Sequence, residues 1–450
     1  MSNISLSSKI ISTLGNPSSI VPLGVKDTFD GLGATYISYN AGGAIEGKDR
    51  FIDEFGTQAI WLFGLPVFKG LIDKTAYKIA KLNPEVDTRI FKQNKDILDL
   101  SIEKAPTKEL QKSILDAQKK LPLFKGLFIS KVLTATALTI ISYTSLSKFK
   151  HLLTKKRLIN QYNENNKINQ EKNNLEKTDN KQNNKDNNIT FKGANLGSVK
   201  NLAEKIMFDP VQNMMLVDAT ITGGRLNNSR NKSEFAEFVL KEGAFWACMY
   251  LLSDPLMKGL ENISEKVFKK PVNLDIRVLT SNDFKDSLKS GKYLNDLKEF
   301  SNQKTDYSLM KFLHDNPENI IVKTAKAAEI IPVYKKNTGF FNKLLGKKVI
   351  DTGKIDTSKF INLDEVRSFA KDIDKYSKKA TKAPEGLEKF IKSTQKMKVG
   401  TVLTSMGTCC ILLGAVVPYL MVKMREKIIG TTQFQVADDV AKELKKEKLA

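Results

Sequence analysis

The uncharged stretch Val399–Val422 is the feature that most restricts how this chain can fold. Its 24 residues, VGTVLTSMGTCCILLGAVVPYLMV, include no Asp, Glu, Lys or Arg. About 20 apolar residues are enough for a helix to cross a ~30 Å hydrocarbon layer. Lysines stand just outside both ends, where their long side chains can reach lipid headgroups. The sequence therefore predicts a membrane-spanning helix at 399–422.

Three weaker apolar runs accompany this stretch. Leu127–Leu146 is interrupted only by Lys131, near one end, so we expect a second span within about 124–147. The runs at about 55–72 and 243–260 are shorter, and each contains a central proline. These two could be short spans, re-entrant hairpins, interfacial helices or core helices of a soluble region, and the sequence leaves the choice open.

Short blocks recur in the same order in the two halves of the chain. KAPTKELQKSILDAQKK, which begins at Lys104, returns as KAPEGLEKFIKSTQKMK at Lys382, just before an apolar run in each case. WLFGLPVFKGL at Trp61 likewise returns as YLLSDPLMKGL at Tyr250. A Gly-Gly pair precedes this second block in both halves, and an Asp-x-Arg triplet follows it. Repetition in a fixed order indicates a tandem duplication.

The expected fold class is mainly α: a helical integral membrane protein built as two homologous halves, with a small soluble insert in the second half. The insert, about 283–380, is predicted to contain helices and a β-hairpin that turns at Thr352–Lys354. The segment between the halves is rich in Asn and Lys and buries too little apolar area to fold. The predicted regions are half 1 at 1–154, a disordered linker at 155–195, half 2 at 196–430 and a polar helix or tail at 431–450.

The net charge of +22 favours anionic partners. Nearly all the cations are Lys, and Arg stands at only eight positions. Proteins that read bases favour Arg because its planar fork makes bidentate contacts, so specific nucleic-acid binding is not expected. The expected partners are the lipid bilayer, through anionic headgroups, and a protein partner that binds the 283–380 insert.

Some charged residues occupy equivalent positions in the two halves. Glu54 and Glu242 open the 55–72 and 243–260 runs, as carboxylates at membrane depth or at its interface, or as first-turn residues stabilised by a helix dipole. Lys69 and Lys258 follow the central prolines and are expected to contact headgroups. Two pairs with a spacing of two residues, on one face of an extended segment, are expected to be structural ion pairs: Asp87 with Arg89, and Asp275 with Arg277.

The sequence offers no catalytic, cofactor-binding or metal-binding constellation. Its two histidines are far apart, and its three cysteines lie in apolar surroundings. The glycine pairs Gly42–Gly43 and Gly223–Gly224 lack the pattern of a phosphate loop, and we expect helix ends or tight turns there. No nucleophile elbow or kinase signature is present. An enzyme is therefore not the expected class.

The expected function is that of a membrane-embedded structural or interaction protein. One alternative is a transporter or channel whose path lies between the two halves, and another is a lipid-modifying membrane enzyme. Lysines crowd after each strong span, and the positive-inside rule assigns such flanks to the cytoplasm. The sequence therefore predicts a multi-pass protein whose N-terminus, linker and C-terminus are all cytoplasmic.

Overall fold

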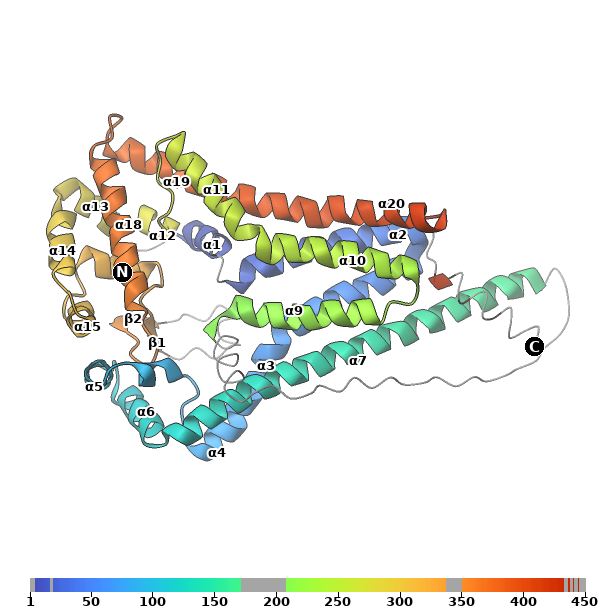
Figure 1. Cartoon of the computed structure of the whole chain (residues 1–450), viewed down its shortest axis with the longest axis horizontal. Helices are drawn as coiled ribbons and strands as arrows, with labels where there is room; N and C mark the ends of the chain where they lie inside the picture. The colour runs from blue at the N-terminus through green and yellow to red at the C-terminus, as the bar shows by residue number, and fades with distance from the viewer. Residues whose placement is uncertain are drawn as a thin grey trace. The chain divides into compact units, whose positions relative to one another are not determined.

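The computed structural model describes residues 5–16, 19–170, 208–336 and 350–432, together with 436, 437, 440 and 444. The predicted mainly helical fold is confirmed, with 81% helix and 2% strand (Figure 1). Three helical stretches of the described residues are long and apolar enough to cross a membrane: Ile20–Ala80, Leu121–Glu164 and Leu387–Ile429. They contain three of the four predicted runs, and the run at 243–260 is not among them.

The chain divides into two compact units. One, which we call the polar unit, comprises 1–16, 71–130 and 256–405, and the other, the bundle unit, comprises 17–70, 131–255 and 406–450. Each half of the chain leaves the bundle unit and later returns to it. The first half does so after Gly70 and Ser130, and the second after Pro255 and Ser405.

Long helices build the bundle unit. Helix α2 breaks at Gly43, whose φ of 81° suits glycine, so it forms two segments, 20–42 and 44–59. The helices that lie in this unit wholly or in part are α2 (Ile20–Ala59), η1 (Ile60–Gly64), α3 (Leu65–Ile72), α7 (Leu121–Gln170), α9 (Pro210–Asn227), α10 (Lys232–Trp246), η4 (Ala247–Leu251), α11 (Ser253–Lys266), α19 (Leu387–Ile411), η5 (Leu412–Val416) and α20 (Val417–Ile429).

Each half contributes a helical hairpin and a third helix to the bundle unit. In the first half these are the two segments of α2 and then α7, and in the second half they are α9, α10 and then α19–α20. The Thr154 hydroxyl donates to Asp49 near the break in α2, and Thr139 packs against Gly64 at the other end of the hairpin. Helix α7 therefore runs toward the break.

In the second half, Arg225 and Arg425, close to the ends of α9 and α20, both reach the segment that follows the break, at Glu54 and Glu46. Helices α7, α9 and α20 thus run in the same direction as segment 20–42 of α2. The corresponding helices of the two halves are parallel.

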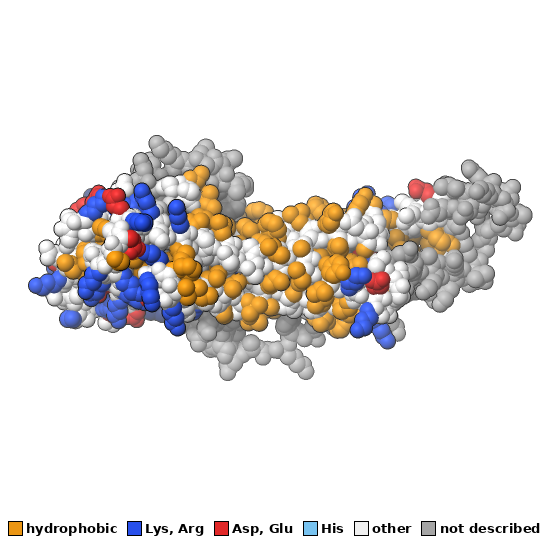
Figure 2. Space-filling model, turned by 90° about the horizontal axis from the view of Figure 1, so that it is seen from above, with side chains coloured by type: hydrophobic (Ala, Val, Ile, Leu, Met, Phe, Trp, Pro, Cys, Tyr) orange, Lys and Arg blue, Asp and Glu red, His pale blue; other side chains and the backbone are white. Residues whose placement is uncertain are grey.

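The outer surface of the bundle unit is apolar. Exposed large hydrophobic side chains occur on α2, η1, α7, α10 and α20, including Tyr36, Phe63, Ile141, Val239 and Tyr419. Figure 2 shows hydrophobic side chains spread over this surface, whereas Lys and Arg gather over the polar unit. Monomeric soluble proteins seldom expose contiguous apolar patches of this kind.

Short helices build the polar unit around one main core. Its elements are α1 (Leu6–Leu14), η2 (Asp73–Tyr77), α4 (Lys78–Ala80), η3 (Thr88–Lys92), α5 (Lys95–Glu103), α6 (Lys108–Lys119), α12 (Ile276–Thr280), α13 (Asn282–Ser290), α14 (Lys292–Ser301), α15 (Asp306–Asp315), α16 (Ile320–Ala327), β1 (Val333–Lys336), β2 (Ile350–Ile355) and α18 (Leu363–Thr381). The core joins insert residues such as Leu309 and Val366 to Ile97 and Leu274, from outside the insert. The 283–380 insert is therefore part of a larger unit.

Two local predictions differ from the structure. The predicted turn at Thr352–Lys354 is wrong, because these residues lie inside β2, which pairs with β1 in antiparallel register. Helix α7 continues to Gln170, so the first part of the 155–195 segment is helical, and 171–195 lies outside the described residues. Most of the predicted tail at 431–450 is also outside them, and α20 ends before Gly430, in the left-handed conformation.

Candidate functional site: the ion network of the bundle unit

Paired ionisable side chains lie in the interior of the bundle unit, beside its apolar core. Arg230, with 17% of its side chain exposed, is the most accessible of them, and the others are below 10%. We call the set the ion network: the carboxylates are Asp30, Glu46, Asp49, Asp53, Glu54, Glu234, Glu237 and Glu242, and the cations are Arg50, Lys150, Arg225, Arg230, Lys241 and Arg425.

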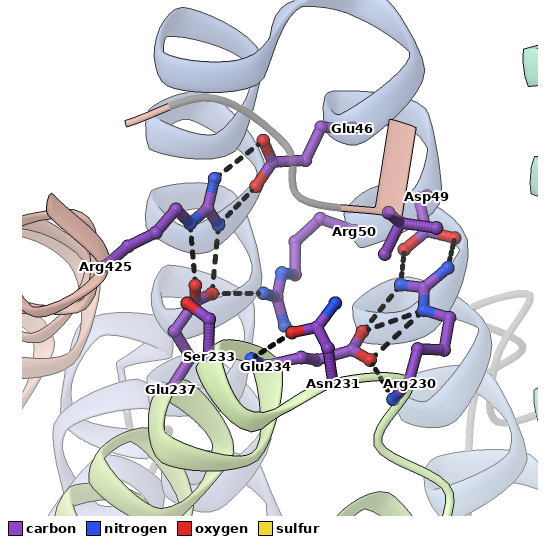
Figure 3. Close-up of a pocket in the computed structure, with 10 residues that line it drawn as sticks. Glu46, Asp49, Arg50, Arg230, Asn231, Ser233, Glu234, Glu237 and Arg425 are labelled. Atoms are coloured by element: carbon purple, nitrogen blue, oxygen red, sulfur yellow. Dashed lines mark hydrogen bonds and ion pairs between the residues drawn. The ribbon is translucent and has the colours of Figure 1, made fainter. Parts of the chain in front are cut away.

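One end of the network is centred on Arg425, from α20 (Figure 3). Its guanidinium binds both oxygens of Glu46, at 2.6 and 2.9 Å, and both oxygens of Glu237, at 2.7 and 3.0 Å. Glu237 also accepts from Arg50 at 3.2 Å. Such bidentate contacts require the planar fork of arginine, which lysine lacks.

A second arginine closes this end of the network. Arg230 lies in the turn between α9 and α10, and binds Asp49 at 2.8 Å and Glu234 at 2.5 Å. The two arginine clusters border a cavity of about 10 Å³, which holds about one water molecule. The hydroxyl of Ser233 also lines this cavity, and it has no hydrogen-bond partner among the described atoms.

Farther into the bundle, Arg225 and Lys241 hold the two glutamates that the sequence singled out. Arg225 binds Glu54 at 3.0 Å and Glu242 at 2.5 Å. Lys241 lies 3.0 Å from Glu54 and 2.7 Å from Asp30. Lys241 and Asp30 are only 1% and 0% exposed, so their attraction acts with little solvent screening.

The principal cations join carboxylates from different halves of the chain. Arg425 binds Glu46 and Glu237, Arg230 binds Asp49 and Glu234, and Arg225 binds Glu54 and Glu242. These carboxylates have the same spacing in both halves, at 46, 49 and 54 and at 234, 237 and 242. The ion network therefore fixes the register of one hairpin against the other.

Burial of the ion network costs a large desolvation free energy, and the network contains more carboxylates than cations. Eight carboxylates face six cations in the set defined above, so two negative charges lack a cation if all groups are ionised. Well-packed apolar residues are often at least as stabilising as a buried ion pair. A network of this size therefore indicates a role other than stability, either in fixing the register of the two hairpins or in binding ions.

Glu54 and Glu242 lie in helix interiors. Glu54 follows the break in α2 by 11 residues, and Glu242 is the eleventh residue of α10. Their interpretation as first-turn residues stabilised by a helix dipole is therefore wrong. Lys69 lies in α3 in the bundle unit, half-buried, and Lys258 is exposed on α11 in the polar unit.

The Asp-x-Arg pairs form two local structures of the same kind in the polar unit. Arg89 binds Asp87 at 2.7 Å and Arg277 binds Asp275 at 3.0 Å. Each aspartate also accepts from the backbone N–H of its arginine and so caps a short helix, η3 or α12. The pairs therefore mark helix starts, where the sequence had suggested an extended segment.

The glycine pairs differ between the halves. Gly43 forms the break in α2, whereas Gly223 and Gly224 lie within α9. At Gly224 a Cβ atom would come 2.9 Å from the ring of Tyr143, so close helix packing accounts for that glycine.

Lys26 is a buried cation of the bundle unit that binds uncharged groups. It is 4% exposed and donates to the Cys248 carbonyl, at 3.2 Å, and to the Ser253 hydroxyl. The Cys409 thiol lies 3.6 Å from the same carbonyl. Because η4 and α11 meet here, this carbonyl lies at a helix break, and Lys26 satisfies it.

Two sequence signals could have revealed the network. One is the repeated acidic spacing, and the other is the placement of arginine. Four of the eight arginines, Arg50, Arg225, Arg230 and Arg425, belong to the network. In a chain where lysine is the usual cation, a retained arginine indicates a bidentate contact.

Within the described residues no group of His, Cys, Asp and Glu is arranged to hold a metal ion. Comparisons of the chain with protein-family models, with curated proteins and with solved structures find no match.

Proposed function

We propose that the protein is a membrane-embedded structural or interaction protein. The bundle unit is seated in the lipid bilayer, and the polar unit lies outside the hydrocarbon layer, where it meets headgroups and protein partners. One observation carries this proposal: the bundle unit has apolar side chains on its outer surface and ion pairs inside. In soluble proteins charged side chains are seldom fully buried unless they are paired, and large apolar outer surfaces are rare, whereas charges in membrane helices face the bundle interior.

We further propose that the two halves arose by tandem duplication. Three features support this: the recurring sequence blocks, the hairpin and third helix in each half, and the matching exits from the bundle unit after Gly70 and Pro255. The paired Asp-x-Arg caps add a fourth. A structure in which the helices of the two halves do not superpose would contradict the duplication.

Lysines near the unit boundaries favour contact with anionic headgroups. Lys69 and Lys74 lie near the first boundary, Lys125 near the second, and Lys258 near the third. Each lysine close to an anionic surface contributes about 1 kcal/mol of attraction. Reconstitution of the chain from detergent should therefore be more efficient into vesicles that contain phosphatidylserine than into vesicles without it, and the difference should shrink at high salt.

Membrane extraction and protease mapping test the placement. If the bundle unit is embedded, alkaline carbonate should leave the chain in the membrane pellet, and detergent should release it. Protease added to sealed vesicles should report the side on which the N-terminus, the 171–207 segment and the C-terminus lie. The positive-inside rule favours the cytoplasm for all three, whereas the shared direction of α2 segment 20–42 and α20 favours opposite sides for the start of α2 and the end of α20. A chain that carbonate releases, or that stays monodisperse without detergent, contradicts the proposal.

A transporter or channel is the second candidate, and the position of the ion network favours it. The network lies between the two halves, where parallel repeats of transporters place their binding sites. Neutralising Glu54 or Glu242 would not by itself separate this candidate from a scaffold, because both residues bind Arg225. A discriminating assay must compare flux through liposomes with the stability of the same variant.

A further inference from the structure

Asp218 differs from the carboxylates of the ion network. It lies on α9 and is 5% exposed, yet no cation forms an ion pair with it in the part of the chain that the structure describes. The Tyr250 hydroxyl donates to one of its oxygens in a short hydrogen bond. Glu54 and Glu242, by contrast, each contact Arg225 and Lys241.

The surroundings of Asp218 do not supply the missing positive charge. The Trp61 side chain, which is 2% exposed, lies beside the carboxyl group. Its indole N–H has no hydrogen-bond partner of good geometry among the described atoms. The ionisable groups that act on Asp218 include Glu242, Arg225, Tyr250 and Asp27, and Asp27 also acts on Tyr250. Arg225 is already shared by Asp53, Glu54 and Glu242.

An isolated carboxylate in an apolar interior is strongly disfavoured, and such a group takes up a proton instead. The neutral acid keeps the Tyr250 hydrogen bond, and it adds no negative charge to an interior that already has more acids than bases. From this geometry we propose that Asp218 is a proton-binding site in the interior of the bundle unit. It carries its proton at neutral pH.

This site deepens the second candidate function and rests on it for its biological role. Asp218 interacts electrostatically with Glu242, which belongs to the ion network, and with Asp27, one turn before Asp30 on α2. These two carboxyl groups are the candidate acceptors for a proton that leaves Asp218. The ligand of the site is a proton, and the partners of transport would be protons or a proton-coupled solute.

Infrared spectroscopy tests the protonation state directly. The full chain in lipid nanodiscs at pH 7 should show the C=O stretch of a buried carboxylic acid, and Asp218→Asn should remove that band. Glu426→Gln is the matched control, because Glu426 is 47% exposed and pairs with Lys423, so this change should affect only the carboxylate bands. A spectrum in which Asp218→Asn removes a carboxylate band and no acid band overturns the proposal.

A hydrophobic carbodiimide gives a second readout. The protonated acid adds across a C=N bond, its proton moves to nitrogen, and the O-acylisourea rearranges to a stable N-acylurea without a leaving group. Asp218 should acquire the mass of the reagent, whereas Glu54 and Glu242 should not. Equal labelling of Glu242, or of all three residues only after unfolding, contradicts the proposal.

Proton flux separates the site from its role. Liposomes that contain the wild-type protein should acidify under an imposed potential, and those with Asp218→Asn should not. If the acid band is present but wild-type liposomes carry no proton current, the transport candidate fails and the proton site stands. If the band is absent, the site itself is refuted.

Discussion

Removal of the Arg225 guanidinium should destabilise the bundle unit far more than removal of an exposed cation. In Arg225→Met, the carboxylates of Glu54 and Glu242 lose contacts of 3.0 and 2.5 Å, and Asp53 loses one of 3.3 Å. Lys241, Lys150 and Arg50 remain, but Lys241 also pairs with Asp30 and Arg50 with Glu237, so the three carboxylates are incompletely neutralised. Breaking a buried pair typically costs about 3–5 kcal/mol, because an uncompensated charge stays behind.

Lys423→Met is the matched control in the same unit. Lys423 pairs with Glu426 on α20, and the two side chains are 54% and 47% exposed, so the expected loss is about 0–1 kcal/mol. Both variants would be unfolded in mixed detergent micelles with rising sodium dodecyl sulfate, and followed by the fluorescence of Trp61 and Trp246, which both lie in the bundle unit.

A charge-compensating variant separates loss of charge from loss of shape. Arg225→Met combined with Glu242→Gln removes one of the stranded carboxylates and should recover part of the lost stability. If Arg225→Met costs less than the exposed control, or if the double variant is no more stable than the single one, then the network is not held by desolvated ion pairs. The account of its register-fixing role would then be refuted.

Three further changes have expected outcomes. Gly33→Leu should prevent folding of the bundle unit, because a Cβ atom at this position overlaps the carbonyl of Gly414. Gly407→Ala should be tolerated, because a Cβ atom there meets nothing within 4 Å. The fraction of monodisperse protein in detergent reports the outcome for both variants. Burial lowers the pKa of His314 to about 4 from 6.5, so the unfolded chain takes up the proton first as pH falls. Amide hydrogen exchange in α15, relative to its intrinsic rate, should therefore accelerate as the pH is lowered from about 6.5 to about 4. The acceleration should be smaller in His314→Leu. Asp275→Asn should loosen α1, because the Ser12 hydroxyl donates to Asp275 at 2.6 Å, and limited proteolysis would detect it.

The apolar runs could be predicted because length and composition alone decide them. The runs at 399–422 and 124–147 need no knowledge of their neighbours to be assigned as helices, and both lie in long helices of the structure. The run at 243–260 could not be decided in this way. It is divided among α10, η4 and α11, and the break before Ser253 depends on Lys26, from a distant part of the chain.

The ion network was not predicted, because a helix with charges at positions three and four apart usually faces solvent. Glu46 and Asp49 have this spacing, as do Glu234 and Glu237. Their burial depends on the packing of one hairpin against the other, which the sequence pattern does not reveal. The repeat had marked Glu54 and Glu242 as equivalent, but only the structure brings them to the same arginine.

The polar unit was missed as a unit because its segments are far apart in the sequence. The insert appeared to be an independent subdomain, since its helices have their own amphipathic pattern. Its core is completed, however, by Ile97 and Leu100 from α5, and by Leu274. Contacts between segments separated by more than 150 residues leave no periodic signal, so the sequence did not reveal the segments that complete the core of the insert.

The helix directions in the bundle unit restrict how this unit can lie in a membrane. Helices α7 and α9 run the same way, so the end of α7 and the start of α9 lie at opposite ends of this unit, and residues 171–209 join them. These residues carry charges throughout, and a hydrocarbon layer excludes such a segment. If the helices cross the bilayer along their full length, the end of α7 and the start of α9 must therefore lie on opposite sides of it. Two cysteine variants at exposed positions, Lys148→Cys on α7 and Gln212→Cys on α9, test this with a membrane-impermeant thiol reagent. Labelling of the two positions from opposite sides supports parallel halves that span the bilayer. Labelling of both from the same side rules out parallel halves that span the bilayer.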